Sequence, residues 1–298
     1  MIQKNNIDGI ILLDKPSMMS SNQAVQKIKR EFSLNKIGHT GTLDPLATGL
    51  LPLCLGKATK IARFLIDSDK TYHATIKLGI KTSTGDKEGE VIETSSVDLP
   101  DDSEVDKIIQ SFVGHQEQIP PMYSALKFKG KRLYKLAIKG IDVPRESRSI
   151  KIHSIDLLSF SKNKLELTIK CSKGTYIRTL AEDIAMEFKS VGHIDQLRRL
   201  NISCFDTQEM HSMNKITSSD VLDDFLLPID APLGHLQNID ISNSESSMFC
   251  NGLPISKDLN KSKSDLYIRV YDDIGTFLGL GQHSNDYLKP RIVFKSMN

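Results

Sequence analysis

Two segments of this chain place apolar side chains at every second position, and this alternation is the feature that most constrains the fold. Residues 70–79 and 164–171 are expected to form strands with one buried face each, because successive side chains of a strand point to opposite faces. A polar turn at residues 86–89 follows the first strand and predicts a hairpin. Apolar side chains with helical spacing occur instead in residues 20–32, 103–113 and 177–188.

These elements do not follow the regular strand–helix cadence of a doubly wound sheet. The chain is therefore predicted to be an α/β (α+β) protein with a mixed, largely antiparallel sheet flanked by helices. Ser20 and Gln23 have the spacing of a capping box, which places the start of the first helix. Residues 119–148 are interrupted by Gly and Pro and are expected to form a long loop, a feature that is usually functional inside a compact domain.

The composition of the chain shifts after about residue 240. Residues 241–247 are polar and rich in Ser, which is typical of a linker or a domain boundary. Short strands are expected beyond it, at residues 266–271, 276–280 and 291–294. The pattern predicts a domain over residues 1–240 and a small β-rich domain over residues 241–298.

Composition also limits the class of protein. The hydrophobic fraction of 39% is typical of a folded globular chain and excludes extensive disorder. No apolar run approaches the roughly 18 residues that a membrane helix needs, and the N-terminus does not resemble a signal peptide. The four cysteines are dispersed, without metal-ligand spacing, at positions Cys54, Cys171, Cys204 and Cys250. We therefore expect a soluble, cytoplasmic protein with reduced thiols and no metal site.

The formal net charge of +2 conceals a strong segregation of charge. Residues 124–178 contain 14 Lys and Arg against 4 Asp and Glu, so this segment carries +10 and the rest of the chain −8. Aromatic side chains are interleaved with these basic residues, at Tyr123, Phe128, Tyr134 and Tyr176. An isolated charge run is more often a set of solvated strand and loop faces, but the interleaved aromatic side chains favour a nucleic-acid surface.

In residues 36–60, KIGHTGTLDPLATGLLPLCLGKATK, the glycines Gly38, Gly41 and Gly49 permit tight backbone turns. Asp44-Pro45 is typical of a helix start, with Asp44 as the N-cap and Pro45 at the first helical position. A phosphate-binding P-loop is excluded, because Gly56-Lys57 is followed by Ala58 where that motif requires Ser or Thr.

Within this segment, GHTGTLDPLATGLLP resembles the signature of the TruB family of tRNA pseudouridine synthases. Five further segments are similar to family blocks and lie in the family's order: GIILLDKPSMMSSNQAVQKIKR (9–30), DSDKTYHATIKLG (67–79), QIPPMYSALKFKGKRLY (118–134), CSKGTYIRTLAEDI (171–184) and GHIDQLRRL (192–200). The resemblance implies a pseudouridine-synthase-like fold with a PUA-like C-terminal domain. It also implies isomerisation of uridine 55 in the T loop of tRNA, with the T stem-loop as partner and no cofactor. The sequence has no obvious apolar stripe that would suggest a dimer, so we expect a monomer.

The resemblance also implies roles for individual residues. Asp44 corresponds to the catalytic aspartate, and the basic part of residues 120–148 to a loop that grips RNA. The substrate-binding positions are His39, Tyr72, Tyr176, Arg178 and Leu197, and the positions expected on the RNA backbone are Lys127, Lys129, Lys131, Arg132 and Lys173. Two departures from the family pattern fall in loops, at Ser83 and Ile138.

The implied reaction breaks a C–N glycosidic bond and forms a C–C bond to the same ribose, so it needs no redox cofactor. The base must first leave its stack. A carboxylate such as Asp44 acts either as a nucleophile or as a base, and the sequence does not choose between them. We expect burial to raise the pKa of Asp44 and the neighbouring Arg178 to reverse that effect.

Simpler interpretations stay open for single residues. Tyr72, Tyr176 and Leu197 would also suit a packed core, His39 a turn, and Arg178 a surface pair with Glu182. An alternative function is a tRNA-binding folding chaperone with vestigial or secondary catalysis. A glycoside hydrolase would need a second acidic residue in a comparable motif, which the sequence lacks.

Overall fold

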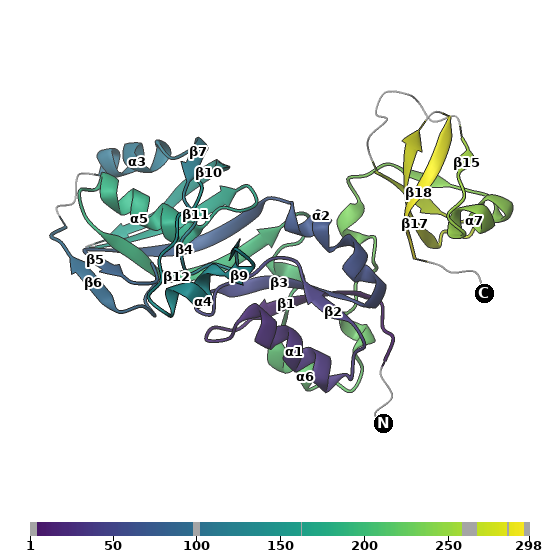
Figure 1. The fold of residues 1–298 in the computed structure, drawn as a ribbon, viewed down its shortest axis with the longest axis horizontal. Helices are drawn as coiled ribbons and strands as arrows, with labels where there is room; N and C mark the ends of the chain where they lie inside the picture. The colour runs from purple at the N-terminus through teal and green to yellow at the C-terminus, as the bar shows by residue number, and fades with distance from the viewer. Residues whose placement is uncertain (1–4, 98–101, 162, 258–266, 285, 295–298) are drawn as a thin grey trace.

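The computed structural model describes residues 5–97, 102–161, 163–257, 267–284 and 286–294. Within these residues, nine strands form the main sheet (Figure 1). They are β1 (Gly9–Lys15), β2 (Ile37–His39), β3 (Thr48–Leu55), β4 (Lys70–Leu78), β7 (Gly114–Gln118), β10 (Arg148–Ser161), β11 (Lys164–Cys171), β12 (Gly192–Ile202) and β13 (His211–Ser212).

The main sheet is mixed and largely antiparallel, as predicted. Its strand order is β13-β1-β3-β12-β4-β11-β10-β7, with β2 paired to β3. The β1–β13 and β3–β12 pairs are parallel, and the remaining pairs are antiparallel. The two alternating segments of the sequence, β4 and β11, are neighbours at the centre of this order, which explains why each buries one face.

Helices cover the sheet. The capping box at Ser20 and Gln23 is present and starts the first helix, as predicted. The α-helices of the main part are α1 (Ser21–Glu31), α2 (Ala62–Ile66), α3 (Asp102–Gln110), α4 (Leu133–Ala137), α5 (Ile177–Glu187) and α6 (Met213–Thr217). Short 3-10 helices are η1 (Gly56–Ile61), η2 (Thr207–Glu209), η3 (Asp223–Phe225) and η4 (Ala231–Leu233).

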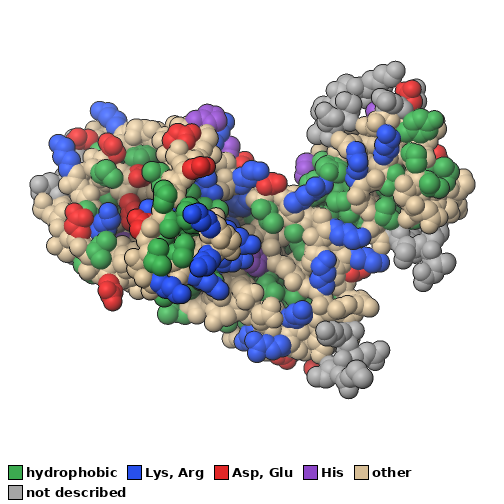
Figure 2. Space-filling model, viewed as in Figure 1, with side chains coloured by type: hydrophobic (Ala, Val, Ile, Leu, Met, Phe, Trp, Pro, Cys, Tyr) green, Lys and Arg blue, Asp and Glu red, His purple; other side chains and the backbone are tan. Residues whose placement is uncertain are grey.

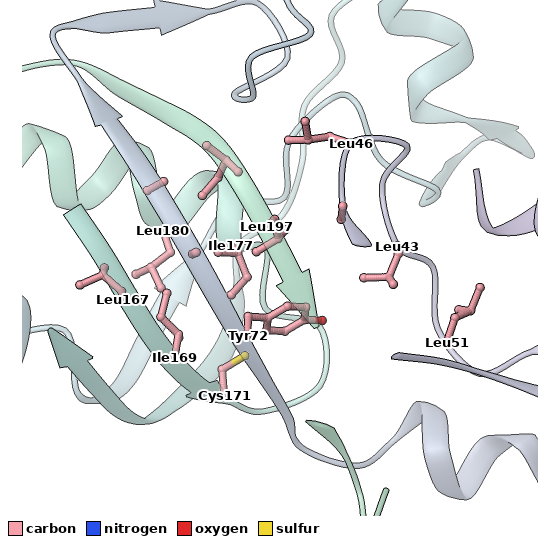
Figure 3. Packing of buried hydrophobic residues seen from close by; sticks show 14 of the residues in the cluster. Leu43, Leu46, Leu51, Tyr72, Leu167, Ile169, Cys171, Ile177, Leu180 and Leu197 are labelled. Atoms are coloured by element: carbon pink, nitrogen blue, oxygen red, sulfur yellow. The ribbon is translucent and has the colours of Figure 1, made fainter. Parts of the chain in front are cut away.

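The core lies where the apolar face of β4 and β11 meets α5. Tyr72 of β4, Leu167 of β11 and Leu180 of α5 belong to one buried cluster (Figure 3). Each fully buried Leu or Ile in this cluster contributes roughly 1.5–3 kcal/mol relative to an exposed position. This packing fixes the N-terminal end of α5, which carries two of the predicted site residues, Tyr176 and Arg178.

Residues 119–148 contain more regular structure than the predicted loop. The short strands β8 (Lys127–Phe128) and β9 (Lys131–Arg132) pair as a hairpin, and α4 follows directly. Lys129 and Gly130 both have positive φ, at 47° and 81°, which is typical of the tight type I′ turn. The predicted loop is therefore interrupted by a hairpin and by α4, whereas residues 141–147 have no regular secondary structure. The hairpin predicted around residues 86–89 is confirmed, with β5 (Ile80–Thr82) paired to β6 (Val91–Thr94).

A second sheet occupies the C-terminal part of the described chain, at the upper right of Figure 1. Its five strands are β14 (Asn238–Asp240), β15 (Ile255–Ser256), β16 (Tyr267–Tyr271), β17 (Phe277–Ser284) and β18 (Tyr287–Val293). Residue 266, expected to begin a strand, lies outside the described residues. The polar residues 241–247 are not a linker, because Ser242 and Glu245 form the capping box of helix α7 (Asn243–Cys250).

The C-terminal sheet packs against η1 and α2. The Arg63 guanidinium lies over the Tyr267 ring, 4.9 Å from its centroid, and also hydrogen-bonds the Tyr267 hydroxyl. Lys60 Nζ donates to the Val293 carbonyl at 2.8 Å. Buried side chains of both parts, including Ile61 and Leu280, share one apolar cluster. In the part of the chain that the structure describes, none of the helices is long and apolar enough to cross a membrane.

Candidate active site

Asp44 lies in the loop that joins β2 to β3. The prediction that Asp44-Pro45 starts a helix was wrong, because the chain makes a single turn, with Ala47 N donating to Asp44 O at 3.1 Å, and then enters β3 at Thr48. The sheet pairing of β3 therefore overrides the local preference of Asp-Pro for a helix start. The Asp44 side chain is one-third exposed, so its carboxylate is accessible from outside the protein.

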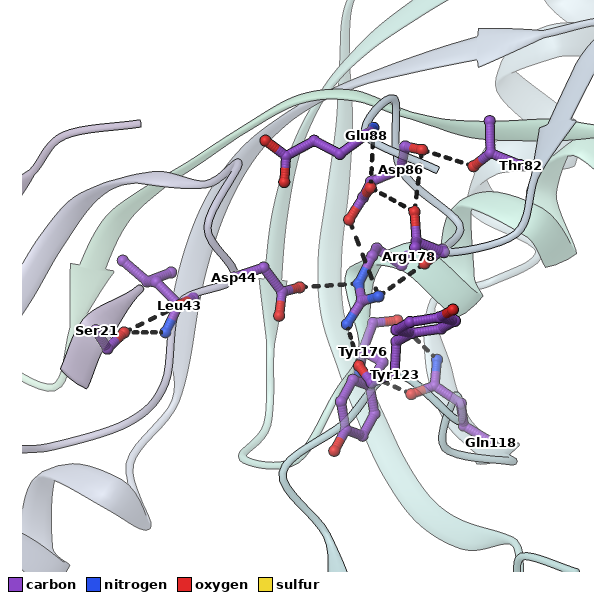
Figure 4. A network of polar contacts seen from close by, with 11 residues as sticks. Ser21, Leu43, Asp44, Thr82, Asp86, Glu88, Gln118, Tyr123, Tyr176 and Arg178 are labelled. Atoms are coloured by element: carbon purple, nitrogen blue, oxygen red, sulfur yellow. Dashed lines mark hydrogen bonds and ion pairs between the residues drawn. The ribbon is translucent and has the colours of Figure 1, made fainter. Parts of the chain in front are cut away.

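Side chains from α1 and β1 hold the Asp44 loop in place. The Ser21 hydroxyl of α1 accepts from Leu43 N at 2.8 Å and donates to Leu43 O at 3.0 Å (Figure 4). Lys15 of β1 is fully buried and donates to the Pro45 carbonyl at 3.2 Å. Burial lowers the pKa of Lys15 to about 8. The residues on both sides of Asp44 are thus fixed.

Arg199 of β12 holds the two ends of the same loop. Its side chain is 1% exposed, and it donates to the Leu50 carbonyl at 2.7 Å and to the Gly41 carbonyl at 3.3 Å. Gly49 has a φ of 97°, and a Cβ at this position would overlap the Arg199 carbonyl oxygen. Sequence reasoning missed Arg199, which lies in the GHIDQLRRL block without a pattern of its own to distinguish it from Arg198.

Arg178 faces Asp44 across the site. Its Nε lies 2.8 Å from Asp44 Oδ2, while Nη1 donates to the Thr84 carbonyl and Nη2 to the Tyr123 carbonyl, both at 2.7 Å (Figure 4). Nη1 is also 3.9 Å from Asp86 Oδ2. The guanidinium is therefore buried between two carboxylates and two loop carbonyls.

This arrangement contradicts the simpler interpretation of Arg178 as a surface partner of Glu182. The Arg178 side chain is 5% exposed and forms its ion pairs with Asp44 and Asp86. A cation at the start of a helix is opposed by the helix dipole, so α5 alone gives no reason for its presence. The ion pairs with Asp44 and Asp86 explain why Arg178 occupies this position.

Asp86 is a site residue that sequence reasoning treated only as part of a turn. It is 5% exposed, and its Oδ1 accepts from the Thr84 hydroxyl at 2.6 Å and from Glu88 N at 3.1 Å. The Thr82 hydroxyl donates to its carbonyl at 2.6 Å. These bonds shape the β5–β6 hairpin so that Asp86 reaches Arg178. A buried acidic residue in a turn cannot be distinguished by sequence from an exposed one.

Burial raises the pKa of Asp44 above its ordinary value. The Arg178 guanidinium opposes this shift, and Asp86, the second carboxylate beside Arg178, adds to it. The expectation that Arg178 would reverse the effect of burial was wrong, because desolvation is the largest contribution. The pKa of Asp44 therefore lies closer to neutral pH than that of an exposed aspartate.

Tyr72 and Leu197 lie side by side in the sheet beneath the loop. Tyr72 is the cross-strand partner of Arg199, and Leu197 that of Ala74. Both side chains are more than nine-tenths buried, and Figure 3 shows the Tyr72 hydroxyl directed out of the aliphatic cluster toward the loop of Leu43. Burial raises the pKa of the Tyr72 phenol, so the hydroxyl stays protonated.

His39 is the last residue of β2. His39 Nδ1 accepts from Gly41 N at 3.4 Å, so the imidazole also supports the turn. Burial lowers the pKa of His39, and the charges of Arg199 and Arg132 lower it further, so the ring is neutral at pH 7. Tyr176 immediately precedes α5.

The residues predicted to contact the RNA backbone fall into two groups. Four of them are exposed on the β8–β9 hairpin, namely Lys127, Lys129, Lys131 and Arg132. Figure 2 shows Lys and Arg side chains gathered over β9 and α4. Lys173 is apart from the hairpin in the chain and forms an exposed ion pair with Asp67 at 2.8 Å. Among the described residues, no group of three His, Cys, Asp or Glu side chains is placed to hold a metal ion.

Comparison with known protein families identifies the family of this chain. Residues 29–177 match the TruB family pseudouridylate synthase (N terminal domain). The chain belongs to the TruB family. Residues 178–234 match the tRNA pseudouridylate synthase B C-terminal domain, and residues 238–294 the C-terminal domain of pseudouridine synthase II TruB. The resemblance inferred from the sequence blocks is therefore confirmed over nearly the whole chain.

Individual relatives agree with this membership of the TruB family. The tRNA pseudouridine synthase B of Methylobacillus flagellatus is 44% identical over 295 residues, covering 98% of this chain and 97% of the relative. That of Neisseria meningitidis serogroup B is 43% identical over 288 residues, covering 95% and 92%. The crystal structure of a Cbf5-Nop10-Gar1 complex shares the fold, with a TM-score of 0.75 at 22% identity over 97% of this chain and 85% of that chain.

Proposed function

We propose that this chain is an isomerase that converts uridine 55 in the T loop of tRNA to pseudouridine. The observation that carries the proposal is the ion pair between Asp44 and the buried Arg178, in a chain whose curated relatives are tRNA pseudouridine synthases B. An intact pair of this kind favours an enzyme over a folding chaperone with vestigial catalysis, since a chaperone has no need of a buried guanidinium held beside a carboxylate.

Asp44 supplies the carboxylate that the reaction requires. The bond between C1′ of the ribose and N1 of uracil breaks, and C1′ then bonds to C5 of the same base. C5 loses a proton and N1 gains one, so the atoms balance without any redox step. Arg178 orients Asp44, and because it also contacts Asp86 and the Thr84 and Tyr123 carbonyls, it does so without reorganising during the reaction.

The other site residues would receive the flipped base. Neutral His39 supports the base without adding a charge, while Tyr72, Tyr176 and the backbone at Leu197 line the pocket. The exposed cations of the β8–β9 hairpin face RNA phosphates. We further propose that residues 1–240 form the catalytic domain, that residues 241–298 form a PUA-like RNA-binding domain, and that the protein acts as a monomer.

An unmodified tRNA transcript tests the proposed function. After incubation with the purified protein, carbodiimide treatment and primer extension are expected to give a strong stop at uridine 55. A transcript with cytidine at that position is the control and should give no stop. Folded protein that leaves the T loop unmodified would contradict the proposal, and stops elsewhere in the tRNA would contradict the choice of uridine 55.

The raised pKa of Asp44 predicts how the rate depends on pH. Because the ionised carboxylate is required, the single-turnover rate should fall about tenfold per pH unit below that pKa, which lies above the value near 3.9 of an exposed aspartate. Folding favours the protonated form of a group whose pKa is raised, so Asp44 itself does not promote acid unfolding. Circular dichroism at each pH checks that the fold persists. A rate that stays constant down to about pH 4 would contradict the prediction.

A further inference from the structure

Two residues outside the predicted site fix the position of Tyr176. Gln118, at the end of β7, is 2% exposed, and its side-chain amide binds both backbone polar groups of Tyr176. Its Oε1 accepts from Tyr176 N at 2.8 Å, and its Nε2 donates to Tyr176 O at 3.1 Å (Figure 4). This paired contact holds the residue that immediately precedes α5.

Arg148 holds the ring of the same tyrosine. It is the first residue of β10 and the cross-strand partner of Gln118, so both residues project from one point of the sheet edge. The Arg148 guanidinium carbon lies 4.5 Å from the centroid of the Tyr176 ring, within the range of a cation–π contact. A Cβ at Gly174, whose φ is 82°, would lie 3.4 Å from Arg148 Nη1.

The hydrogen bonds of Arg148 do not explain its position. Its Nε and Nη2 atoms are buried, and neither has a hydrogen-bond partner among the described residues. Burying an unpaired N–H group is unfavourable, and such a group in a native structure needs a specific reason. The contact with the Tyr176 ring therefore explains the position of the guanidinium, which in turn holds that ring in place.

Tyr176 is two residues before Arg178 in the chain, so a shift of its backbone would also move the first turn of α5. We propose that Gln118 and Arg148 are positioning residues that hold the Tyr176 ring in the orientation needed to stack on the flipped uracil. This inference rests on the proposed function of the chain as a pseudouridine synthase.

Substitutions at Arg148 test this role. Arg148→Met removes the guanidinium but keeps much of the length of the side chain, and we expect the single-turnover rate to fall about three- to thirtyfold, the range that a cation–π contact corresponds to. The Kd for tRNA should change by less than about twofold, because no phosphate contact is assigned to Arg148. Arg148→Lys keeps the cation and should recover part of the rate. Lys151→Met removes an exposed cation from the same strand and should leave the rate unchanged.

A double-mutant cycle with Tyr176→Leu separates positioning from a general structural effect. If Arg148 acts through the ring, Arg148→Met should not lower the rate further in the Tyr176→Leu background. An equal fold-loss of the rate in both backgrounds, or a loss of tRNA binding with an unchanged rate, would overturn the inference.

Should Arg148→Met fail to fold, Arg148→Lys and Gln118→Glu provide the same comparison with smaller changes. Inactive wild-type protein would contradict the proposed function, whereas an active wild type with an unaffected Arg148→Met variant would contradict only this inference.

Discussion

Replacing Asp44 with asparagine is expected to abolish pseudouridine formation while leaving tRNA binding largely intact. The amide occupies the same space in the loop but can neither act as a nucleophile nor remove a proton, so the rate should fall by at least about 10²–10⁴-fold. Single-turnover assays with saturating enzyme measure this loss directly. Filter binding with the same tRNA measures the Kd, which we expect to stay within a few-fold of the wild type.

The control for Asp44→Asn is Asp156→Asn, which removes one exposed carboxylate from β10. This variant should retain both rate and binding, which shows that a change of one charge is not the cause. Retained turnover in Asp44→Asn would exclude Asp44 as the catalytic residue. Loss of tRNA binding together with the rate would instead show that the carboxylate organises the binding surface.

The second large effect is expected for Arg178→Met. This change leaves Asp44 and Asp86 close together without the guanidinium that lies between them, and it removes hydrogen bonds to the Thr84 and Tyr123 carbonyls. Removing one partner of a buried ion pair is strongly destabilising. Since Asp44 is one-third exposed, we expect a loss of about 2–4 kcal/mol in the free energy of unfolding. Urea denaturation measures this loss.

The catalytic rate of Arg178→Met should fall as well as its stability. The pKa of Asp44 would rise further without the guanidinium, so less of the carboxylate is ionised at pH 7 and the rate should recover partly as the pH is raised. Arg178→Lys retains the charge, but its single ammonium cannot reach Asp44, Thr84 and Tyr123 together, so an intermediate rate is expected. An Arg178→Met variant as stable and as active as the wild type would show that the ion pair has no role.

Local patterns in the sequence predicted much of the fold. The alternation in β4 and β11 identified two central strands, and the spacing of Ser20 and Gln23 placed the start of α1. Each of these patterns reports on a few consecutive residues whose environment repeats with the period of a strand or a helix. The predictions failed where tertiary contacts decide, as at Asp44-Pro45, where strand pairing prevents a helix, and at residues 241–247, where the polar serines cap one.

The sequence by itself determined the family and the faces of the central strands, and it singled out Asp44 as the aspartate proposed to supply the carboxylate. Only the tertiary structure decided that Arg178 lies between Asp44 and Asp86 and that Arg199 holds both ends of the Asp44 loop. The physical reason is the sequence separation of these contacts. Periodicity specifies which face of its own element a side chain occupies, whereas the partner it meets depends on sheet register and on how helices pack against the sheet.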